Sequence, residues 1–116
     1  MTRGEIWWAD FGIPFGSEPG YKRPVLIVQD DYFNSSSIKT TVIVPFSTNL
    51  ILADAPGNIL LEKGLTKLSK DSVLVGSQIY SIDRRRLIEK ISKVEKRLFA
   101  DIEDGLLIVL GIKKPI

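Results

Sequence analysis

The sequence contains no histidine and no cysteine. Without these residues the chain cannot build a Ser-His or Cys-His nucleophile pair, an ordinary zinc site or a disulfide, and no imidazole can shuttle protons near neutral pH. Any catalysis must therefore use carboxylates, arginine, lysine, hydroxyl groups or the backbone. The lack of cysteine also fits a reducing compartment.

Long hydrophobic runs are also missing. No apolar stretch approaches the roughly 18 residues that would span a bilayer, and the N-terminus, Met1 to Glu5, lacks the hydrophobic segment of a signal peptide. We therefore expect a cytoplasmic protein without membrane contact. With 116 residues, 44% of them hydrophobic, the chain is long enough for a single core, and we expect one domain over residues 1–116.

The net charge is small but unevenly distributed. It is +2 for the whole chain; residues 1–62 hold four basic and seven acidic side chains, whereas residues 63–116 hold twelve basic and seven acidic. Between Arg84 and Arg97 there are seven basic residues and two glutamates. A basic stripe of this kind can track phosphates. A solvated face of a strand and a helix explains it equally well.

The stretch Gly16–Gln29, GSEPGYKRPVLIVQ, joins a polar loop to a buried strand. Glycine and proline interrupt residues 12–22 without a usable period, which predicts a long loop, and loops of this length are often functional. The apolar run Val25–Val28 predicts a strand. Because Pro24 cannot donate to a ladder, we expect it at the first position of this strand, with Arg23 extended at the strand mouth.

Other short segments with β-branched or alternating apolar residues predict further strands. They are Gly4–Phe11, Thr40–Val44 ended by Pro45, Asn58–Leu61, Asp71–Ser81 with a possible bulge at Gly76, and Ile88–Ile91. Trp7 and Trp8 are neighbours in the first segment, so a strand points them to opposite faces. We expect one in the core and the other at the surface, half-buried, stacked on a base or in a dimer contact.

A helix is predicted near the C-terminus. Ser92–Glu95 matches the capping box, Leu98, Ile102, Leu106 and Leu110 follow at helical spacing, and Gly111 ends the pattern. Gly105 destabilises this helix by ~1 kcal/mol relative to alanine, so packing must hold it.

Five or six short strands with one terminal helix, and no alternating strand-helix units, predict a mainly β (α+β) fold. The expected architecture is a strongly curved antiparallel sheet or small barrel.

Several of these segments together resemble the MazF/PemK family of toxin endoribonucleases. They are RGEIWWADF (Arg3–Phe11), FGSEPGYKRPVLIVQ (Phe15–Gln29), VIVPFSTN (Val42–Asn49), DSVLVGSQIYSID (Asp71–Asp83) and the final LG (Leu110–Gly111). The resemblance implies an SH3-like small barrel that dimerises and cleaves single-stranded RNA, including mRNA, at short sequences without a metal or other cofactor. It also implies a cognate antitoxin whose extended, largely acidic segment occupies the RNA groove.

By position in these motifs, the family's catalytic arginine falls on Arg23 and its catalytic hydroxyl on Thr48. Glu18 matches the acidic residue of the GSE motif. Residues expected to contact RNA are Lys22, Ser47, Asn49, Gln78, Ser81, Arg84 and Arg86. Pro19 stands where many relatives carry glutamine, so the family's cleavage-site preference does not transfer.

The implied chemistry agrees with the residue types present. The RNA's own 2′-hydroxyl is the nucleophile, which gives 2′,3′-cyclic phosphate and 5′-hydroxyl ends, so no histidine or cysteine is needed. The planar fork of Arg23 suits two phosphoryl oxygens, Thr48 can donate to a non-bridging oxygen, and Glu18 is the only nearby candidate base.

Alternatives remain open at this point. The same barrel could be a non-catalytic toxin that poisons DNA gyrase, or an RNA-binding module that uses the basic stripe and a tryptophan. Arg23, Glu18 and Thr48 also suit ordinary roles at a strand start and in turns.

Overall fold

Short strands dominate the chain, as the hydrophobic patterns predict. The computed structural model describes residues 1–18 and 20–115. The strands are β1 (Glu5–Asp10), β2 (Lys22–Ile27), β3 (Thr40–Ser47), β4 (Ile59–Leu61), β5 (Ser72–Leu74), β6 (Tyr80–Asp83) and β7 (Leu87–Lys93). The helices are α1 (Asp31–Asn34), α2 (Lys63–Thr66) and α3 (Lys96–Val109), with 3-10 turns η1 (Leu50–Asp54), η2 (Gly76–Gln78) and η3 (Arg84–Arg86).

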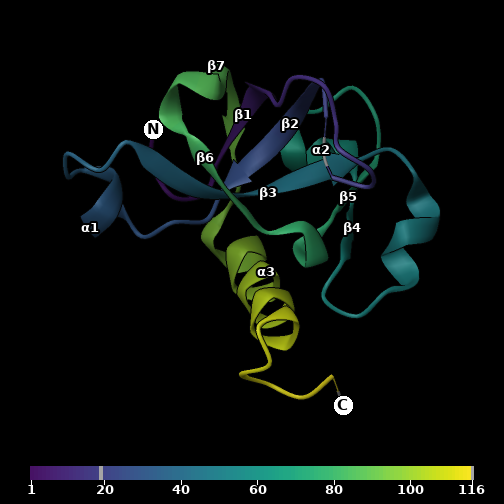
Figure 1. Cartoon of the computed structure of the whole chain (residues 1–116). Helices are drawn as coiled ribbons and strands as arrows, with labels where there is room; N and C mark the ends of the chain where they lie inside the picture. Colours follow the sequence, from purple (N-terminus) through teal and green to yellow (C-terminus); the bar gives the residue numbers. More distant parts are fainter. Residues whose placement is uncertain (19, 116) are drawn as a thin grey trace.

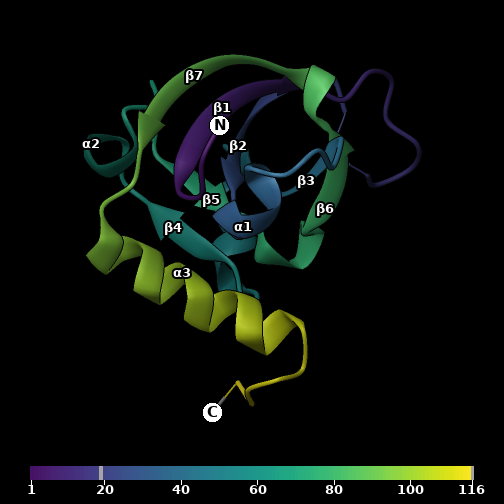
Figure 2. The same cartoon turned by 90° about the vertical axis from the view of Figure 1, so that its left-hand side faces the viewer.

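These strands form one antiparallel sheet in the order β4-β5-β3-β2-β1-β7, and β6 also pairs with β3. Figures 1 and 2 show an open sheet that curls on itself, with β7 arching over β1 and α3 lying across one side. The predicted curved antiparallel fold with a C-terminal helix is confirmed. Within the described residues, no helix is long and apolar enough to span a bilayer.

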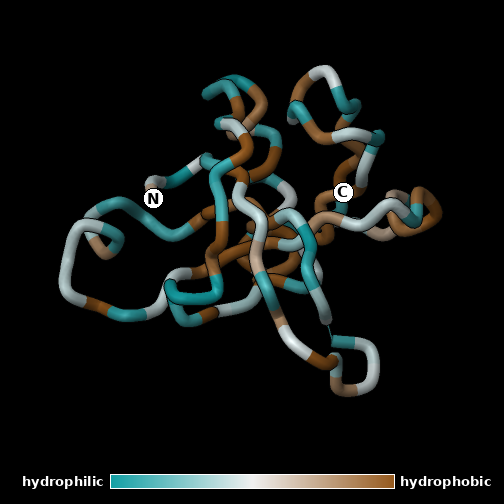
Figure 3. Tube along the Cα trace, turned by 90° about the horizontal axis from the view of Figure 1, so that it is seen from above, coloured by the Kyte–Doolittle hydropathy of each residue, from teal (hydrophilic) through white to brown (hydrophobic). Residues whose placement is uncertain are grey.

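Both faces of the central strands are buried. On one face Ile6, Leu26 and Val44, neighbours across β1, β2 and β3, pack with Phe99 and Ile102 of α3. The second cluster, on the other face, consists of Ala9, Val25, Ile27, Ile43 and Ile82. Burial on both faces explains why β2 reads as a continuous apolar run. Figure 3 shows hydrophobic residues gathered at the centre of the trace, whereas the outer loops mix hydrophilic and hydrophobic residues.

Pro24 and Pro45 lie inside strands, and the strand boundary predicted from each of them is wrong. Pro45 lies opposite Val25 within β3, and its carbonyl oxygen accepts from Val75 N at 2.9 Å. On that side β6 pairs with β3 up to Ile43, and β5 pairs with it only from Phe46. Pro45 thus falls in a gap between two partner strands, where a missing N–H breaks no ladder bond.

Pro24 has a similar place. It is the third residue of β2 and not the first, opposite Trp8 of β1, and the pairing of β2 with β3 begins at the next residue, Val25. The strand therefore tolerates the proline, and Arg23 lies within β2 rather than just before it.

The stretch Asp71–Ser81 is two strands and not one. β5 and β6 are separated by the turn η2, which begins at Gly76. A side chain at Gly76 would collide with the carbonyl oxygen of Gly57, so the chain needs glycine where it leaves β5. The break lets β3 pair with β5 near its C-terminal end and with β6 near its N-terminal end.

The C-terminal helix begins later than predicted. Ser92 lies in β7, where its hydroxyl donates to the carbonyl of Thr66, and α3 starts at Lys96 with Glu95 in the cap position and no side-chain cap bond. The predicted capping box is therefore wrong. A Cβ on Gly105 would lie 2.9 Å from the Gly57 carbonyl oxygen, so this glycine permits a close approach of helix and turn.

Candidate functional site

One end of the sheet brings together the start of β2 and the ends of β1 and β3. Asp10 lies opposite Lys22, and Ala9 lies opposite Arg23. Because Val25 lies opposite Pro45 in β3, Ser47 at the end of that strand is next to the start of β2. This end is called the mouth here. It contains four residues predicted from the sequence: Lys22, Arg23, Ser47 and Thr48.

Arg23 and Thr48 keep their polar groups available. Arg23 is partly buried and Thr48 is exposed. Among the described residues, neither the Arg23 guanidinium nor the Thr48 hydroxyl takes part in a hydrogen bond or salt bridge. Ser47 is engaged, because its Oγ accepts from Asn49 N at 3.1 Å. The mouth therefore offers an unengaged cation and a hydroxyl donor to a ligand.

A small cavity of about 110 Å³ opens beside Thr48. Its lining residues are Trp8, Pro24, Phe46, Ser47, Thr48, Leu68, Ser69, Lys70 and Ser72. Trp8 is 38% exposed, whereas Trp7 is partly buried and its Nε1 donates to Glu5 Oε1 at 3.0 Å. Trp8 is thus the surface tryptophan of the pair. Alternation along β1 indicated that one tryptophan would be exposed, but nothing in the sequence pointed to Ser69 or Lys70.

Glu18 lies in the loop between β1 and β2. In the described residues, its side chain shares no hydrogen bond with the residues of the mouth. Phe11 N donates to Tyr21 O at 2.8 Å and closes the base of the loop. Gln78 Nε2 donates to Ser17 O at 3.3 Å, which ties the loop to η2. A pocket of about 450 Å³ is lined by Phe15, Gly16, Ser17, Glu18, Ser77, Gln78, Ile79 and Tyr80. Two predicted residues, Glu18 and Gln78, therefore share this pocket.

Pro19, the residue at which the sequence departs from the family's motif, lies outside the described residues. Within the described part of the chain, the carboxylate of Glu18 forms no hydrogen bond or ion pair with Arg23 or Thr48. Glu18 is exposed, so its carboxylate is open to solvent.

The three consecutive arginines of η3 diverge. Arg86 Nη1 donates to Asp10 O at 3.0 Å, which places it at the mouth. Arg84 Nη2 donates to Phe33 O at 2.9 Å, beside α1. Arg85 makes two hydrogen bonds to the carboxylate of Asp83, each 3.0 Å long. Only Arg86 is therefore near Arg23.

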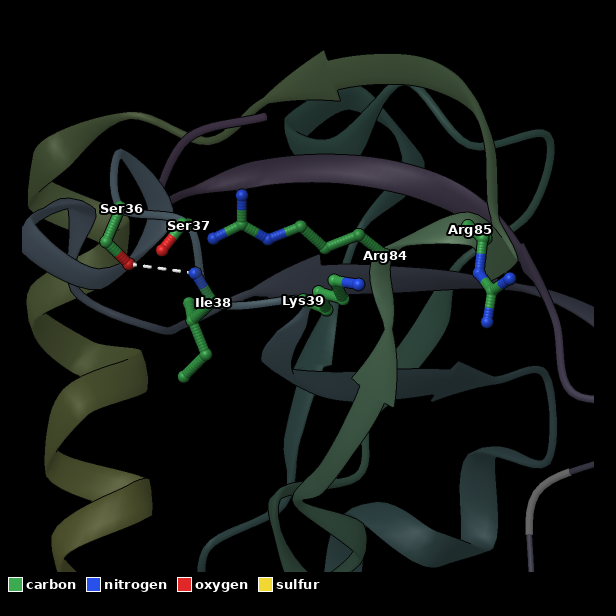
Figure 4. A pocket seen from close by; sticks show the side chains of 6 residues that line it. All are labelled: Ser36, Ser37, Ile38, Lys39, Arg84 and Arg85. Atoms are coloured by element: carbon green, nitrogen blue, oxygen red, sulfur yellow. Dashed lines mark hydrogen bonds between the residues drawn. The ribbon is translucent and has the colours of Figure 1, made fainter.

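Arg84 lies by the opposite end of β3 from the mouth. Its backbone N–H donates to Lys39 O, just before β3 begins, and eight residues of strand separate the two ends by roughly 20–25 Å. Figure 4 shows Arg84 extending toward Ser37 in a pocket of about 420 Å³, with Arg85 apart from it. Ser81, exposed on β6 opposite Val42, also lies along this half of β3.

The carboxyl group of Asp83, next to the arginines of η3, is held ionised. The hydrogen bonds from Arg85 lower the pKa of the Asp83 carboxyl to about 2. Asp83 is consequently a poor candidate for proton transfer at neutral pH. In residues 1–18 and 20–115, no group of three or more acidic side chains is placed to hold a metal ion.

Comparisons with known proteins agree in sequence and in structure. The profile of the PemK-like, MazF-like toxins of type II toxin-antitoxin systems matches residues 2–110. Endoribonuclease MazF6 of Mycobacterium tuberculosis and endoribonuclease MazF2 of Mycobacterium bovis are each 36% identical over 112 residues, covering 97% of this chain and 98% of the relative.

Two solved structures share the fold. MazF of Deinococcus radiodurans superposes with a TM-score of 0.78 at 21% identity, covering 96% of both chains. A mycobacterial endoribonuclease in complex with its cognate antitoxin superposes with a TM-score of 0.75 at 19% identity, covering 97% of both chains.

Proposed function

This chain belongs to the PemK-like, MazF-like toxins of type II toxin-antitoxin systems and is an endoribonuclease, and we propose that it cleaves single-stranded RNA at the mouth without a metal. Cutting mRNA in this way inhibits translation and growth. The observation that carries the proposal is the pairing of an unbonded guanidinium, Arg23, with an unbonded hydroxyl, Thr48, at the adjoining ends of β2 and β3.

In the proposed reaction the RNA supplies its own nucleophile. The 2′-oxygen forms a bond to phosphorus, and the bond between phosphorus and the 5′-oxygen breaks. The 2′-hydroxyl proton passes to a base, and the 5′-oxygen takes up a proton from water. The products are a 2′,3′-cyclic phosphate and a 5′-hydroxyl.

Arg23 and Thr48 stabilise the charge that develops on the phosphoryl oxygens. A guanidinium donates two parallel hydrogen bonds to such oxygens and keeps its charge throughout. Partial burial of Arg23 strengthens this interaction relative to water. Thr48 adds a neutral donor to a non-bridging oxygen. Both groups lie on or next to strands, which hold them in place before substrate arrives.

Glu18 is the candidate base for the 2′-hydroxyl proton. Its carboxylate is exposed and sits in a loop anchored to η2 by Gln78. In this role the loop brings Glu18 to the RNA when the substrate binds. Catalytic hydrogen bonds that are long in a free enzyme often shorten only in its substrate complex.

The remaining predicted contacts follow the RNA backbone. Lys22 and Arg86 flank Asp10 at the mouth and suit phosphates next to the cleaved one. Ser47, Asn49 and Gln78 add polar contacts around them. Arg84 and Ser81 would meet RNA only farther along β3.

The protein partners follow from the same surface. We propose that a cognate antitoxin occupies the RNA groove with an extended acidic segment, since the mouth presents Lys22, Arg23, Lys70 and Arg86. A related mycobacterial endoribonuclease is known in complex with its cognate antitoxin. We also propose that the toxin is a homodimer.

The experiment that tests the proposal is cleavage of a single-stranded RNA in excess EDTA. Wild-type protein, Arg23→Ala, Thr48→Val and the control Arg97→Ala, an exposed arginine of α3, are compared. We expect discrete cuts with 2′,3′-cyclic phosphate and 5′-hydroxyl ends from the wild type and the control only. A 2′-deoxy substitution at the cut nucleotide should abolish cleavage.

Two results would overturn the proposal. Intact RNA with folded wild-type protein would favour a gyrase-directed toxin or a plain RNA-binding module. Cleavage that disappears in EDTA and returns with a divalent ion would contradict the metal-free reaction.

A further inference from the structure

We propose that the small cavity between Trp8 and Lys70 binds one base of the RNA, next to the phosphate that is cleaved. This inference rests on the proposed endoribonuclease function. It assigns a substrate contact to Trp8, one of the two tryptophans that the sequence offered for stacking on a base, and to Ser69 and Lys70, which no motif identified. The cavity is called the base pocket below.

The backbone fixes Trp8 as one wall of the base pocket. Trp8 lies opposite Pro24 in β1 and β2, and both line the cavity with Phe46 of β3. The indole is 38% exposed in a cavity wall, although burying such a ring within the protein would be favourable. Exposed aromatic side chains of this kind are the platforms on which proteins stack unpaired bases.

The lining of the base pocket also carries unengaged hydrogen-bond donors. In the described part of the chain, the side chains of Thr48, Ser69 and Lys70 form no hydrogen bond or salt bridge. Ser72, also in the lining, is satisfied because its Oγ donates to Lys70 O at 3.1 Å. Three lining side chains from two separate segments therefore keep donors that no protein group accepts, in the same cavity as Trp8.

The size and chemistry of the cavity fit a base. At about 110 Å³ it is well below the roughly 300–1,000 Å³ of a pocket for a whole small molecule, so it takes a fragment of a larger ligand. Lysine is only a donor, so it favours a base edge that accepts. Uracil, guanine and cytosine carry carbonyl oxygens of this kind and adenine carries none, so we expect one of these three bases in the base pocket.

Position in the site then follows from Thr48. This residue lines the base pocket and is also the proposed donor to the scissile phosphate. A base held against Trp8 therefore belongs to a nucleotide adjoining that phosphate. In this position the base pocket sets both the register of the RNA and the identity of one recognised base.

The test measures binding of an RNA that cannot be cut, with 2′-deoxyribose at the cleaved nucleotide. Affinities are compared for wild type, Trp8→Ala, Trp8→Phe, Lys70→Gln and the control Lys63→Ala, an exposed lysine outside the base pocket. Loss of stacking on Trp8→Ala should weaken binding about 5- to 150-fold. Trp8→Phe should retain most of the affinity, and Lys63→Ala should match the wild type. Thermal melts confirm that each variant is folded.

A series of RNAs with one abasic nucleotide identifies the base. In wild type, one abasic position next to the cleaved phosphate should weaken binding by a similar factor. In Trp8→Ala that position should have little further effect, because the two changes remove the same contact. Replacing that base with adenine should weaken binding to wild type more than to Lys70→Gln.

Equal RNA affinity for wild type, Trp8→Ala and Lys70→Gln would overturn the inference and leave the cavity to a protein side chain or to no ligand. Additive losses for Trp8→Ala and every abasic position would overturn it too. Because these affinities need no cleavage, a wild-type protein that binds RNA but leaves cuttable RNA intact would contradict the proposed reaction and not the base pocket.

Discussion

The polar side chains at the two ends of β3 differ in how far other protein groups satisfy their hydrogen bonds. At the end near α1, the buried Asn34 donates to Gln29 O and Asp31 Oδ1 and accepts from Thr41 Oγ1, all at 2.9 to 3.0 Å. At the mouth, Arg23 and Thr48 have no such partners in the described residues. The side chains of Asn34 and Thr41 at the first end are satisfied by the protein and stabilise it. Arg23 and Thr48 at the second remain open to a ligand, so we expect changes at the two ends to affect different measurements.

Arg23→Ala should give the largest effect. Removing a preorganised donor to the phosphoryl oxygens should lower kcat by about 10²–10³-fold, with little change in melting temperature because no internal bond is lost. Single-turnover cleavage and thermal melts check this. A variant that melts several degrees lower and cleaves normally would show that Arg23 stabilises the fold and does not serve cleavage. The contrast between the two ends of β3 would then be wrong.

Glu5, at the start of β1 on the α1 side, should make stability depend on acid pH. Burial alone would raise its pKa, but hydrogen bonds from Trp7 and Thr2 and the Lys90 ammonium outweigh burial and lower the pKa to about 2. A lowered pKa in the folded state stabilises the fold above the unfolded pKa of about 4.5, and this contribution is lost as the pH falls toward 2.

The contribution at stake is at most about 3 kcal/mol. Urea unfolding of wild type and Glu5→Gln between pH 7 and pH 2 measures it, and the difference between the two should shrink across this acid range. A constant difference at every pH would show that Glu5 acts only through packing.

Asn34→Ala should destabilise the fold by about 1–3 kcal/mol, because it leaves the buried hydroxyl of Thr41 without its acceptor and removes one of the two acceptors of the Gln29 amide. Chemical denaturation gives the free energy of unfolding. Cleavage by the folded fraction should stay at the wild-type rate. A fall in kcat with unchanged stability would mean that the α1 end also serves the reaction.

Arg84→Gln and Arg86→Gln form a matched pair with the smallest effects. Arg84 bonds Phe33 O beside α1, so its loss should cost about 0.5–1.5 kcal/mol of stability. Arg86 is at the mouth, and its loss should reduce the salt dependence of RNA binding by about 0.7 in the slope of log K against log salt, the value for one phosphate on a single strand. Equal salt slopes for the two variants would erase the distinction.

Sequence patterns predicted most of the fold because its signals are local. Alternation and β-branched residues located the strands, and the helical spacing located α3. The strand boundaries predicted from Pro24 and Pro45 were wrong because the effect of a proline depends on which strand lies beside it. Pro45 is tolerated only because β6 ends and β5 begins on either side of it, which no local signal contains.

The predicted start of α3 was wrong for a related reason. Ser92 and Glu95 have the spacing of a capping box, but β7 continues through Lys93 beside β1, and the hydroxyl of Ser92 binds Thr66 instead. Sheet pairing outcompetes a local cap, since burial of the strand outweighs one cap bond of about 1 kcal/mol.

Some residues of the candidate site could be predicted from local sequence signals, and others could not. Arg23 and Thr48 could be found because they adjoin strong strand signals and the family motifs. Ser69 and Lys70 lie in a connection without a pattern, and only folding brings them beside Trp8. The spacing of Arg84, Arg85 and Arg86 gave no means of separating them, although a single turn sends them to three different partners.

The meeting of Gly57, Gly76 and Gly105 has a consequence for how this sequence can change. A side chain at either Gly76 or Gly105 would press on the same carbonyl of Gly57. Because both alanines act on one carbonyl, a shift forced by the first changes the space left for the second, so the two costs should not simply add. Substitutions at these distant positions are therefore not independent, and drift at one changes which residues the other can accept.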